Sequence, residues 1–269
     1  MQEAVRRRDP GALREAEPAP RGALERVHPA GYLDRLARLA AGGGAMLDPD
    51  TFLSAASYRA ACAGAGAALA ALRHAHETGT HAFAAIRPPG HHALAETAMG
   101  FCFLANAVIA AREAQALGLG RVLIVDWDVH HGNGTQALVE RDPTIRFVSL
   151  HQWPHYPGTG PANERGVGNV FNLPRPPGLL PAQYVADLEE GVRAALTGWT
   201  PDVILISAGY DSMRGDPLGG FTLEPEHYAG LAAFLRTHCP EVPIVGLMEG
   251  GYDPDRLASG VLATLEALA

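Results

Sequence analysis

Short apolar runs alternate along the chain with longer segments that have helical spacing of apolar residues. The short runs are typical of buried strands and lie at 82–87, 121–127, 145–150, 202–208 and 243–248. The helical segments lie at about 54–77, 103–117, 183–197, 224–237 and 255–267. Strands buried on both faces of a parallel sheet have nearly continuous apolar sequences, and helices connect such strands. We therefore predict one α/β domain over residues 1–269, a three-layer fold built on a mostly parallel sheet.

Two stretches, the second of them rich in Gly and Pro, are predicted to be loops at the rim of this sheet. They lie at 44–50 and 153–181. Loops at strand ends often carry binding residues. The first loop could therefore offer Asp48 or Asp50 to the backbone of a substrate.

Composition limits the class of protein. With 269 residues and 47% hydrophobic content, the chain can bury one large core. Its three cysteines, Cys62, Cys102 and Cys239, form no paired framework, and no apolar run approaches the ~20 residues of a membrane span. We expect a cytoplasmic protein with no signal peptide and no membrane span.

The charge of the chain argues against nucleic acid as a partner. The net charge is -8, and every basic residue is an arginine. We interpret the Arg6 to Arg8 run as a solvated helix face rather than a nucleic-acid patch. Direct nucleic-acid binding is therefore not expected.

The most informative segment follows the apolar run at 121–125. There Asp126, Asp128 and His130 alternate, so in a strand their side chains would face one pocket. A buried strand should not carry two carboxylates unless something compensates their charge, and a divalent cation would do so. The alternative for this segment alone is a strand end whose acids cap the next helix.

Three other predicted strands also end in residues that can bind or transfer protons. His91 and His92 stand in a proline-stiffened loop, Asp211 follows an apolar strand, and Tyr252 follows a glycine pair. Each could be structural: loop histidines, an N-cap or a core aromatic. Because ligands bind at the carboxyl ends of parallel strands, we expect these ends to form one site.

The motifs together resemble those of the histone deacetylase superfamily, which includes acetylpolyamine amidohydrolases and acetoin-utilisation-type proteins. The similarity runs from about residue 27 to the end. It points to the branch of class II-like bacterial deacetylases and acetylpolyamine amidohydrolases. The matching motifs are RPPGHHA at 87–93, GFC at 100–102, DWDVHHGNGTQ at 126–136, SLH at 149–151, PGTG at 157–160, SAGYD at 207–211, GDPLGG at 215–220 and EGGY at 249–252.

The resemblance implies an arginase/deacetylase-like fold, but the usual first strand and its His-Pro-rich rim loop have no counterpart at the start of this sequence. A sheet edge without that strand would expose unpaired backbone groups. We therefore expect lower stability or cover by another chain, for instance a homo-oligomer.

One catalytic metal is expected. Asp128, His130 and Asp211 supply two oxygens and one nitrogen, and a fourth position is left for water. Zn²⁺ suits this set, and Fe²⁺ accepts it as well.

The resemblance places His91 and His92 beside that water. Asp126 would orient His91, and Asn133 would orient His92. A carboxylate partner raises the basicity of an imidazole, whereas an amide leaves the pKa near its ordinary value. We expect His92 to be the main general base and acid, and Tyr252 to donate a hydrogen bond to the developing oxyanion.

The resemblance also implies a structural potassium ion behind the metal and a substrate tunnel in front of it. Phe101 and Tyr156 would wall the tunnel, with Gly100 and Leu218 also lining it. The implied potassium positions are Asp126, Asp128, His130, Ser149 and Leu150.

The function implied is hydrolysis of an acyl-lysine at its ε-amine, by metal-activated water. An acetylpolyamine or another small acylated amine is the alternative substrate, although Leu218 stands where polyamine-specific relatives carry Glu. A two-metal ureohydrolase of the arginase type fits less well, because Asp211 is followed by Ser-Met-Arg. A weak acyl-binding protein is disfavoured by the complete set of catalytic residues.

Overall fold

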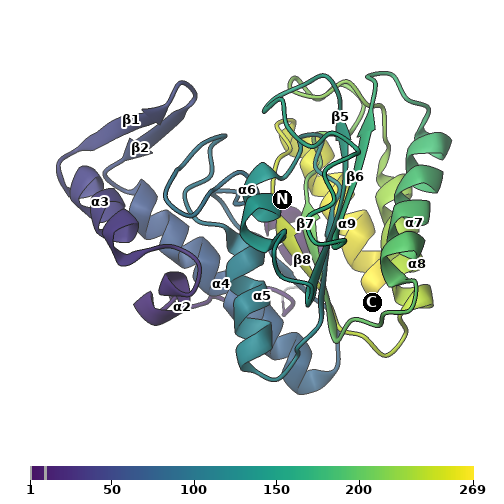
Figure 1. Ribbon diagram of the computed structural model, residues 1–269, viewed down its shortest axis with the longest axis horizontal. Helices are drawn as coiled ribbons and strands as arrows, with labels where there is room; N and C mark the ends of the chain where they lie inside the picture. Colours follow the sequence, from purple (N-terminus) through teal and green to yellow (C-terminus); the bar gives the residue numbers. More distant parts are fainter. Residues whose placement is uncertain (1, 9–10) are drawn as a thin grey trace.

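A central parallel sheet lies between two layers of helices (Figure 1). The structure, a computed structural model, describes residues 2–8 and 11–269. The sheet order is β3-β8-β7-β4-β5-β6, and every neighbouring pair is parallel. The strands are β3 (Ala82–Ala84), β4 (Val122–Asp126), β5 (Ile145–Gln152), β6 (Val170–Arg175), β7 (Val203–Ala208) and β8 (Ile244–Met248).

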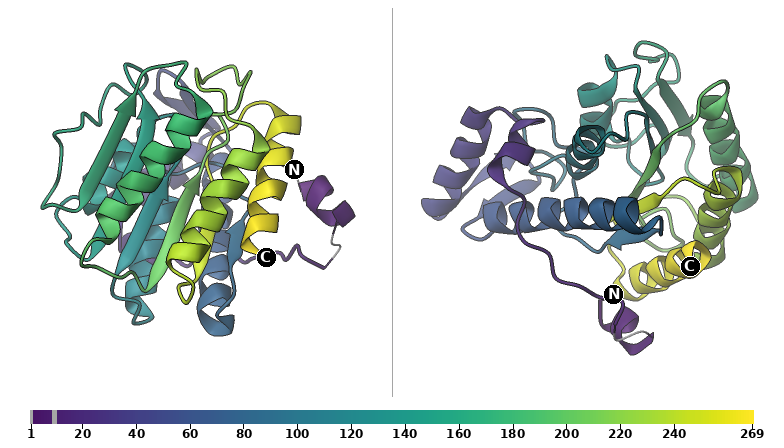
Figure 2. Two further views of the ribbon diagram at one scale, coloured as in Figure 1. Left: turned by 90° about the vertical axis from the view of Figure 1, so that its right-hand side faces the viewer. Right: turned by 90° about the horizontal axis from the view of Figure 1, so that it is seen from below.

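Helices cover both faces of the sheet (Figures 1 and 2). This confirms the predicted three-layer α/β fold. One layer contains α4 (Ser57–Thr78), α5 (Asn106–Ala116) and α6 (Asn133–Val139). The other contains α7 (Pro181–Leu196), α8 (Pro225–His238) and α9 (Pro254–Leu268).

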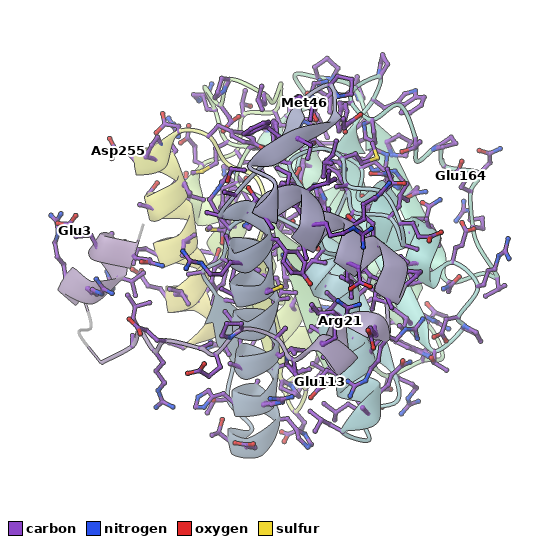
Figure 3. The ribbon with its side chains drawn as sticks, turned by 90° about the vertical axis from the view of Figure 1, so that its left-hand side faces the viewer. Glu3, Arg21, Met46, Glu113, Glu164 and Asp255 are labelled. Carbon is purple, nitrogen blue, oxygen red and sulfur yellow. The ribbon has the colours of Figure 1, made fainter. Side chains whose placement is uncertain are left out.

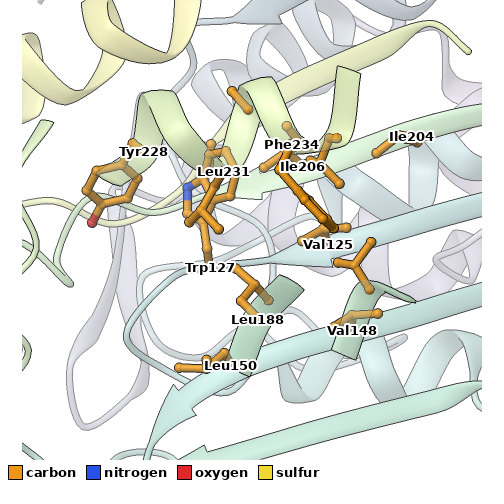
Figure 4. Packing of buried hydrophobic residues seen from close by; sticks show 14 of the residues in the cluster. Val125, Trp127, Val148, Leu150, Leu188, Ile204, Ile206, Tyr228, Leu231 and Phe234 are labelled. Carbon is orange, nitrogen blue, oxygen red and sulfur yellow. The ribbon is translucent and has the colours of Figure 1, made fainter. Parts of the chain in front are cut away.

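Strand β4 shows why the strand sequences are apolar throughout. Leu123 and Val125 pack in the core beneath α7 and α8, whereas Val122 and Ile124 pack in the core beneath α4 and α5. Full burial of such side chains stabilises the fold by roughly 1.5–3 kcal/mol each. Figure 4 shows the first of these cores, in which Trp127 extends the same row of side chains.

The structure corrects both predicted rim loops. Residues 44–50 belong largely to an antiparallel hairpin of β1 (Gly44–Asp48) and β2 (Thr51–Ser54). The 153–181 stretch contains β6, an edge strand of the main sheet. An edge position tolerates Pro174, which has no N–H to donate to a further strand.

An additional layer lies outside α4. It consists of α2 (Arg21–Glu25), α3 (Ala30–Ala41) and the hairpin, which carries Met46 (Figure 3). Helix α1 (Gln2–Arg8) lies instead against α9 (Figure 2), and its Arg6 to Arg8 are exposed, as expected. In the described part of the chain, no helix has the length and apolar character that crossing a membrane requires.

One buried carboxylate ties this layer to α5. Glu113 of α5 accepts hydrogen bonds from Arg73 of α4 at 2.6 Å and from Arg26, which follows α2. The pKa of Glu113 is lowered because these two arginines outweigh the effect of burial. Glu113 and Arg21 lie on the same side of the molecule in Figure 3.

Strands β3 and β6 form the two edges of the sheet. Within residues 2–8 and 11–269, no strand pairs with the outer side of β3. Cover of this edge by another chain stays a prediction.

The N-terminal segment crosses α4 at a glycine, which generates a stability prediction. A Cβ on Gly66 would lie 2.0 Å from the Glu17 carbonyl oxygen, whereas a Cβ on Gly230 of α8 would meet nothing within 4 Å. We expect Gly66→Ala to lower the free energy of unfolding by about 1–3 kcal/mol. Gly230→Ala should raise it by about 0.5–1 kcal/mol, because alanine favours helix. Urea unfolding of both variants tests this, and equal stabilisation by the two substitutions would contradict it.

Candidate metal centre

The candidate site lies at the carboxyl ends of four adjacent strands. In the sheet order these are β3, β8, β7 and β4. The loops that follow them carry the predicted residues, which are far apart in sequence. Adjacent parallel strands therefore bring the tandem histidines, the acids and Tyr252 to one edge, where α/β proteins bind ligands.

Asp128, His130 and Asp211 form a compact buried group. Their candidate ligand atoms all lie within 4.8 Å of one another. The Nδ1 atom of His130 lies 3.0 Å from Oδ1 of Asp128 and 3.3 Å from Oδ2 of Asp211. Two carboxylates and one imidazole nitrogen thus converge on one point.

Backbone N–H groups fix the orientation of the two acids. Oδ1 of Asp128 accepts a hydrogen bond from the N–H of His130 at 2.9 Å, and Oδ2 accepts one from Gly250 at 2.9 Å. Oδ1 of Asp211 accepts one from Val129 at 2.8 Å. These bonds tie the end of β4 to the loops after β7 and β8.

Regular strand geometry stops before this group. Strand β4 ends at Asp126, whose Oδ1 accepts the N–H of Asp128 at 3.1 Å. The strand does not continue through Asp128 and His130. Instead, the carboxylates of Asp126 and Asp128 each accept the backbone N–H two residues further on, which sets the spacing of these side chains. Asp126 is turned to His91 instead of joining the metal-ligating group.

The group is suited to a divalent cation. Oδ2 of Asp211 is buried and accepts no hydrogen bond from the described residues. Burial and the adjacent Asp128 raise the pKa of Asp211, so its negative charge needs compensation. A cation among two carboxylates and one imidazole provides it, and Zn²⁺ and Fe²⁺ both accept carboxylate oxygens and imidazole nitrogens as ligands.

The tandem histidines have different partners. Nδ1 of His91 lies 3.0 Å from Oδ2 of Asp126, and Nδ1 of His92 lies 2.7 Å from Oδ1 of Asn133. The ring centroids of His91 and His92 are 4.0 Å apart. Because Oδ1 of Asn133 can only accept, Nδ1 of His92 donates, and its Nε2 keeps a lone pair when the ring is neutral.

These partners move the two imidazole pKa values in opposite directions. Burial disfavours charge on His91, but Asp128 and Asp126 outweigh it and raise its pKa well above the ordinary value. Burial lowers the pKa of His92 well below the ordinary value, and the neighbouring His91 and His130 lower it further. The expectation that the pKa of His92 stays near its ordinary value is therefore wrong.

Tyr252 lies in the loop that follows β8. Its ring lies edge-on to Phe101, with centroids 6.0 Å apart, and its N–H donates to Oδ2 of Asp216 at 2.8 Å. Burial raises the pKa of Tyr252, and the carboxylates of Asp211 and Asp128 raise it further. The hydroxyl therefore keeps its proton and is available as a donor.

The predicted tunnel residues surround the same region. A Cβ on Gly100 would lie 2.3 Å from Cδ2 of His92, so only glycine fits there. Phe101 has a positive φ of 65°, a strained conformation for a bulky residue. The Tyr156 ring lies edge-on to His92 at 5.1 Å, and its hydroxyl is buried without a described hydrogen-bond partner. The side chain of Leu218 is partly exposed at the rim.

The predicted potassium positions lie behind the group. Ser149 of β5 is in register with Asp126 of β4, and the Ser149 hydroxyl lies 3.0 Å from Nδ1 of His151. Ser149 and Leu150 are fully buried. Occupation by potassium stays a prediction.

Comparison with known proteins identifies the family. The profile of the histone deacetylase domain matches residues 1–268. This chain belongs to the histone deacetylase family. The match spans the whole fold described above and includes every residue of the candidate site.

Sequences and solved structures agree with this assignment. An uncharacterized protein of Synechocystis sp. is 46% identical, over 90% of this chain and 80% of its own length. A histone deacetylase-like amidohydrolase of Pseudomonas aeruginosa is 38% identical, over 96% of this chain and 70% of its own length. A crystal structure of an HDA15 HD domain has a TM-score of 0.94 and 34% identity, over 99% of this chain and 78% of that one. A crystal structure of an acetylpolyamine aminohydrolase from Burkholderia pseudomallei has a TM-score of 0.90 and 28% identity, over 99% of this chain and 88% of that one.

Membership makes the chain a hydrolase of the deacetylase and amidohydrolase type. Both candidate substrate classes, acylated lysines and acylated polyamines, fall within this assignment.

The sequence reasoning missed two residues at the site. Glu249 is buried, and its carboxylate accepts backbone N–H groups of the tandem-histidine loop. His155 stacks on His130, with centroids 5.0 Å apart, and its Nε2 lies 2.8 Å from the Leu218 carbonyl oxygen. Glu249 could have been found by the signal that identified Asp211, an acid directly after an apolar strand. His155 gave no comparable signal.

Proposed function

We propose that this protein is a metal-dependent amidohydrolase that removes the acyl group from the ε-amine of an acyl-lysine. One observation carries the proposal. A buried Asp128, His130 and Asp211 group lies beside two histidines, His91 and His92, that have unlike partners. A metal site and a proton-transfer pair are thereby available at the same strand ends.

Asp128, His130 and Asp211 would hold the metal, with Zn²⁺ as the first choice and Fe²⁺ as the alternative. A metal bound there supplies Lewis-acid polarisation of the amide carbonyl and lowers the pKa of water. A potassium ion at Asp126, Asp128, His130, Ser149 and Leu150 would stabilise the charge behind it.

His92 is the general base of the proposal. Its ring is neutral at neutral pH, so Nε2 can take a proton from the attacking water and then give it to the leaving amine. His91 is held by Asp126, and the carboxylates of Asp128 and Asp126 raise its pKa, which favours a protonated ring beside the reacting carbonyl. Tyr252 keeps its proton and donates a hydrogen bond to the developing oxyanion.

The rim supports acyl-lysine as the substrate. Leu218 presents an apolar side chain, 39% exposed, where an anion would be needed to select a polyamine. Phe101 and Tyr156 can grip the methylene groups of a lysine stem between aromatic faces. An acetylpolyamine is the second candidate, because the hairpin carries Asp48 and Asp50, whose charges raise the pKa of Tyr156 in addition to its burial. The Thr51 hydroxyl beside them accepts the N–H of Phe101 at 3.0 Å.

The metal assignment predicts that Asp211→Ala loses the metal and the activity together. It also predicts that metal binding releases a proton. Burial disfavours the charge on His130, but the carboxylates of Asp128 and Asp211 outweigh it and raise its pKa to about 10. Below that pH the metal must displace a proton, so affinity should weaken by about tenfold per pH unit as pH falls.

Elemental analysis and calorimetry in buffers of different ionisation enthalpy would measure both effects. Asp202→Ala, at the opposite end of β7, is the control and should keep the metal. Full metal occupancy in Asp211→Ala would show that the ligand assignment is wrong.

The oxyanion assignment predicts that Tyr252→Phe keeps the metal but lowers kcat by roughly 10²- to 10³-fold. The hydroxyl is needed mainly where charge develops in the transition state. Steady-state kinetics on the metal-loaded enzyme would test this. A large rise in KM at unchanged kcat would mean that Tyr252 only binds substrate.

The substrate assignment predicts a higher kcat/KM for acyl-lysine peptides than for acetylated polyamines on metal-reconstituted enzyme. Leu218→Glu should move the ratio toward polyamines by about fivefold, as expected for one exposed charge pair worth ~1 kcal/mol. A wild-type preference for polyamines would favour the second candidate. Hydrolysis of neither class by the metal-loaded protein would reject the proposed function.

A further inference from the structure

We propose that Glu249 is a positioning residue for the tandem histidines. In this inference, which rests on the proposed function, its carboxylate holds the backbone at Gly90 and His91 so that His91 and His92 keep their catalytic orientation. Glu249 itself touches neither the metal-ligating group nor the imidazole rings through any hydrogen bond of the described residues.

The contacts of Glu249 are direct and buried. Oε2 accepts the N–H of Gly90 at 2.6 Å and the N–H of His91 at 3.1 Å. The residue is 1% exposed. Its own N–H donates to the carbonyl oxygen of Ala208 at 3.1 Å, which anchors Glu249 to the end of β7. Through Glu249, the histidine loop is therefore attached to the carboxyl end of β7 in the central sheet.

The peptide groups at His91 are held on two sides. Glu249 accepts the N–H of His91, while the carbonyl oxygen of His91 accepts the N–H groups of Gly134 and Thr135 at 3.0 and 3.1 Å. The ring of His91 is bound to Asp126. Of these contacts, only the one to Glu249 comes from the β8 side. Removing it would leave the loop free to move away from β8 and toward α6.

Glu249 also links the loop of the proton-transfer histidines to the segment that contacts a metal-ligating acid. The next residue, Gly250, donates its N–H to Asp128, and Tyr252 follows within the same loop. One short segment thus sets the position of the base loop, a metal-ligating acid and the hydroxyl donor relative to one another. Misplacement by about 1 Å can lower turnover about 10²-fold.

A purely structural role for the carboxylate is the alternative. Burying a carboxylate costs stability, and Oε1 accepts no hydrogen bond in the described parts of the chain. Glu113 offers a matched comparison, because it is a buried carboxylate that joins helices away from the site. The two roles make different predictions for the same kind of substitution.

The test compares Glu249→Ala, Glu249→Gln and Glu113→Ala as metal-loaded proteins. We expect Glu249→Ala to lower kcat by about 10- to 100-fold, with little change in KM and unchanged metal content. Glu249→Gln should recover most of the loss, because its amide oxygen can accept both N–H groups. Glu113→Ala should lower the unfolding temperature but keep the kcat of the folded protein.

Amide hydrogen exchange gives a readout that does not depend on activity. Exchange at Gly90 and His91 should accelerate in Glu249→Ala and not in Glu249→Gln or Glu113→Ala. Wild-type kcat in Glu249→Ala, or unchanged exchange at these two amides, would overturn the inference. So would a Glu249→Gln variant as impaired as Glu249→Ala. If the wild-type protein hydrolysed no acylated amine, the proposed function would fail, and the exchange data would still decide whether Glu249 holds the loop.

Discussion

The structure depends on burying several negative charges at one edge of an apolar sheet. Asp126, Asp128 and Asp211 are fully buried, and the segment that carries each of them packs in the apolar core. An isolated carboxylate in such surroundings would be protonated or would destabilise the fold. The neighbouring groups can therefore be understood as compensation: backbone N–H donors, a cationic His91, and a position suited to a divalent cation.

Compensation requires the backbone to approach these carboxylates closely. A Cβ on Gly209 would lie 2.2 Å from Oδ2 of Asp128, and a Cβ on Gly250 would lie 2.1 Å from Oδ2 of Asp211. Only glycine leaves room for the oxygens at these two positions. Gly209 after β7 and Gly250 after β8 therefore let the backbone pack directly against buried carboxylates, in addition to any role in turns.

The sequence predicts the parts of the fold whose signal is continuous. The strands β4, β5, β7 and β8 are apolar on both faces, and the motifs at their ends mark the site. The hairpin was not predicted because its strands are short, although Pro49-Asp50 between apolar pairs is a turn signal. Strand β6 was not predicted because Asn172 and Pro174 interrupt its pattern, which only an edge position permits. The pKa of His92 could not be predicted from its partner alone, since it depends on charges that only the fold brings near.

The site is assembled from segments that are remote along the chain. The hydrogen bond between Gly90 and Glu249 spans 159 positions, and the one between Val129 and Asp211 spans 82. Closing such long loops costs conformational entropy, and folds rich in contacts of this kind fold slowly. During synthesis the tandem histidines emerge long before the segment that holds them. A nascent chain that ends before β8 therefore has Asp126 and Asn133 beside its histidines but lacks Glu249, the carboxylate proposed to hold their loop, and Tyr252.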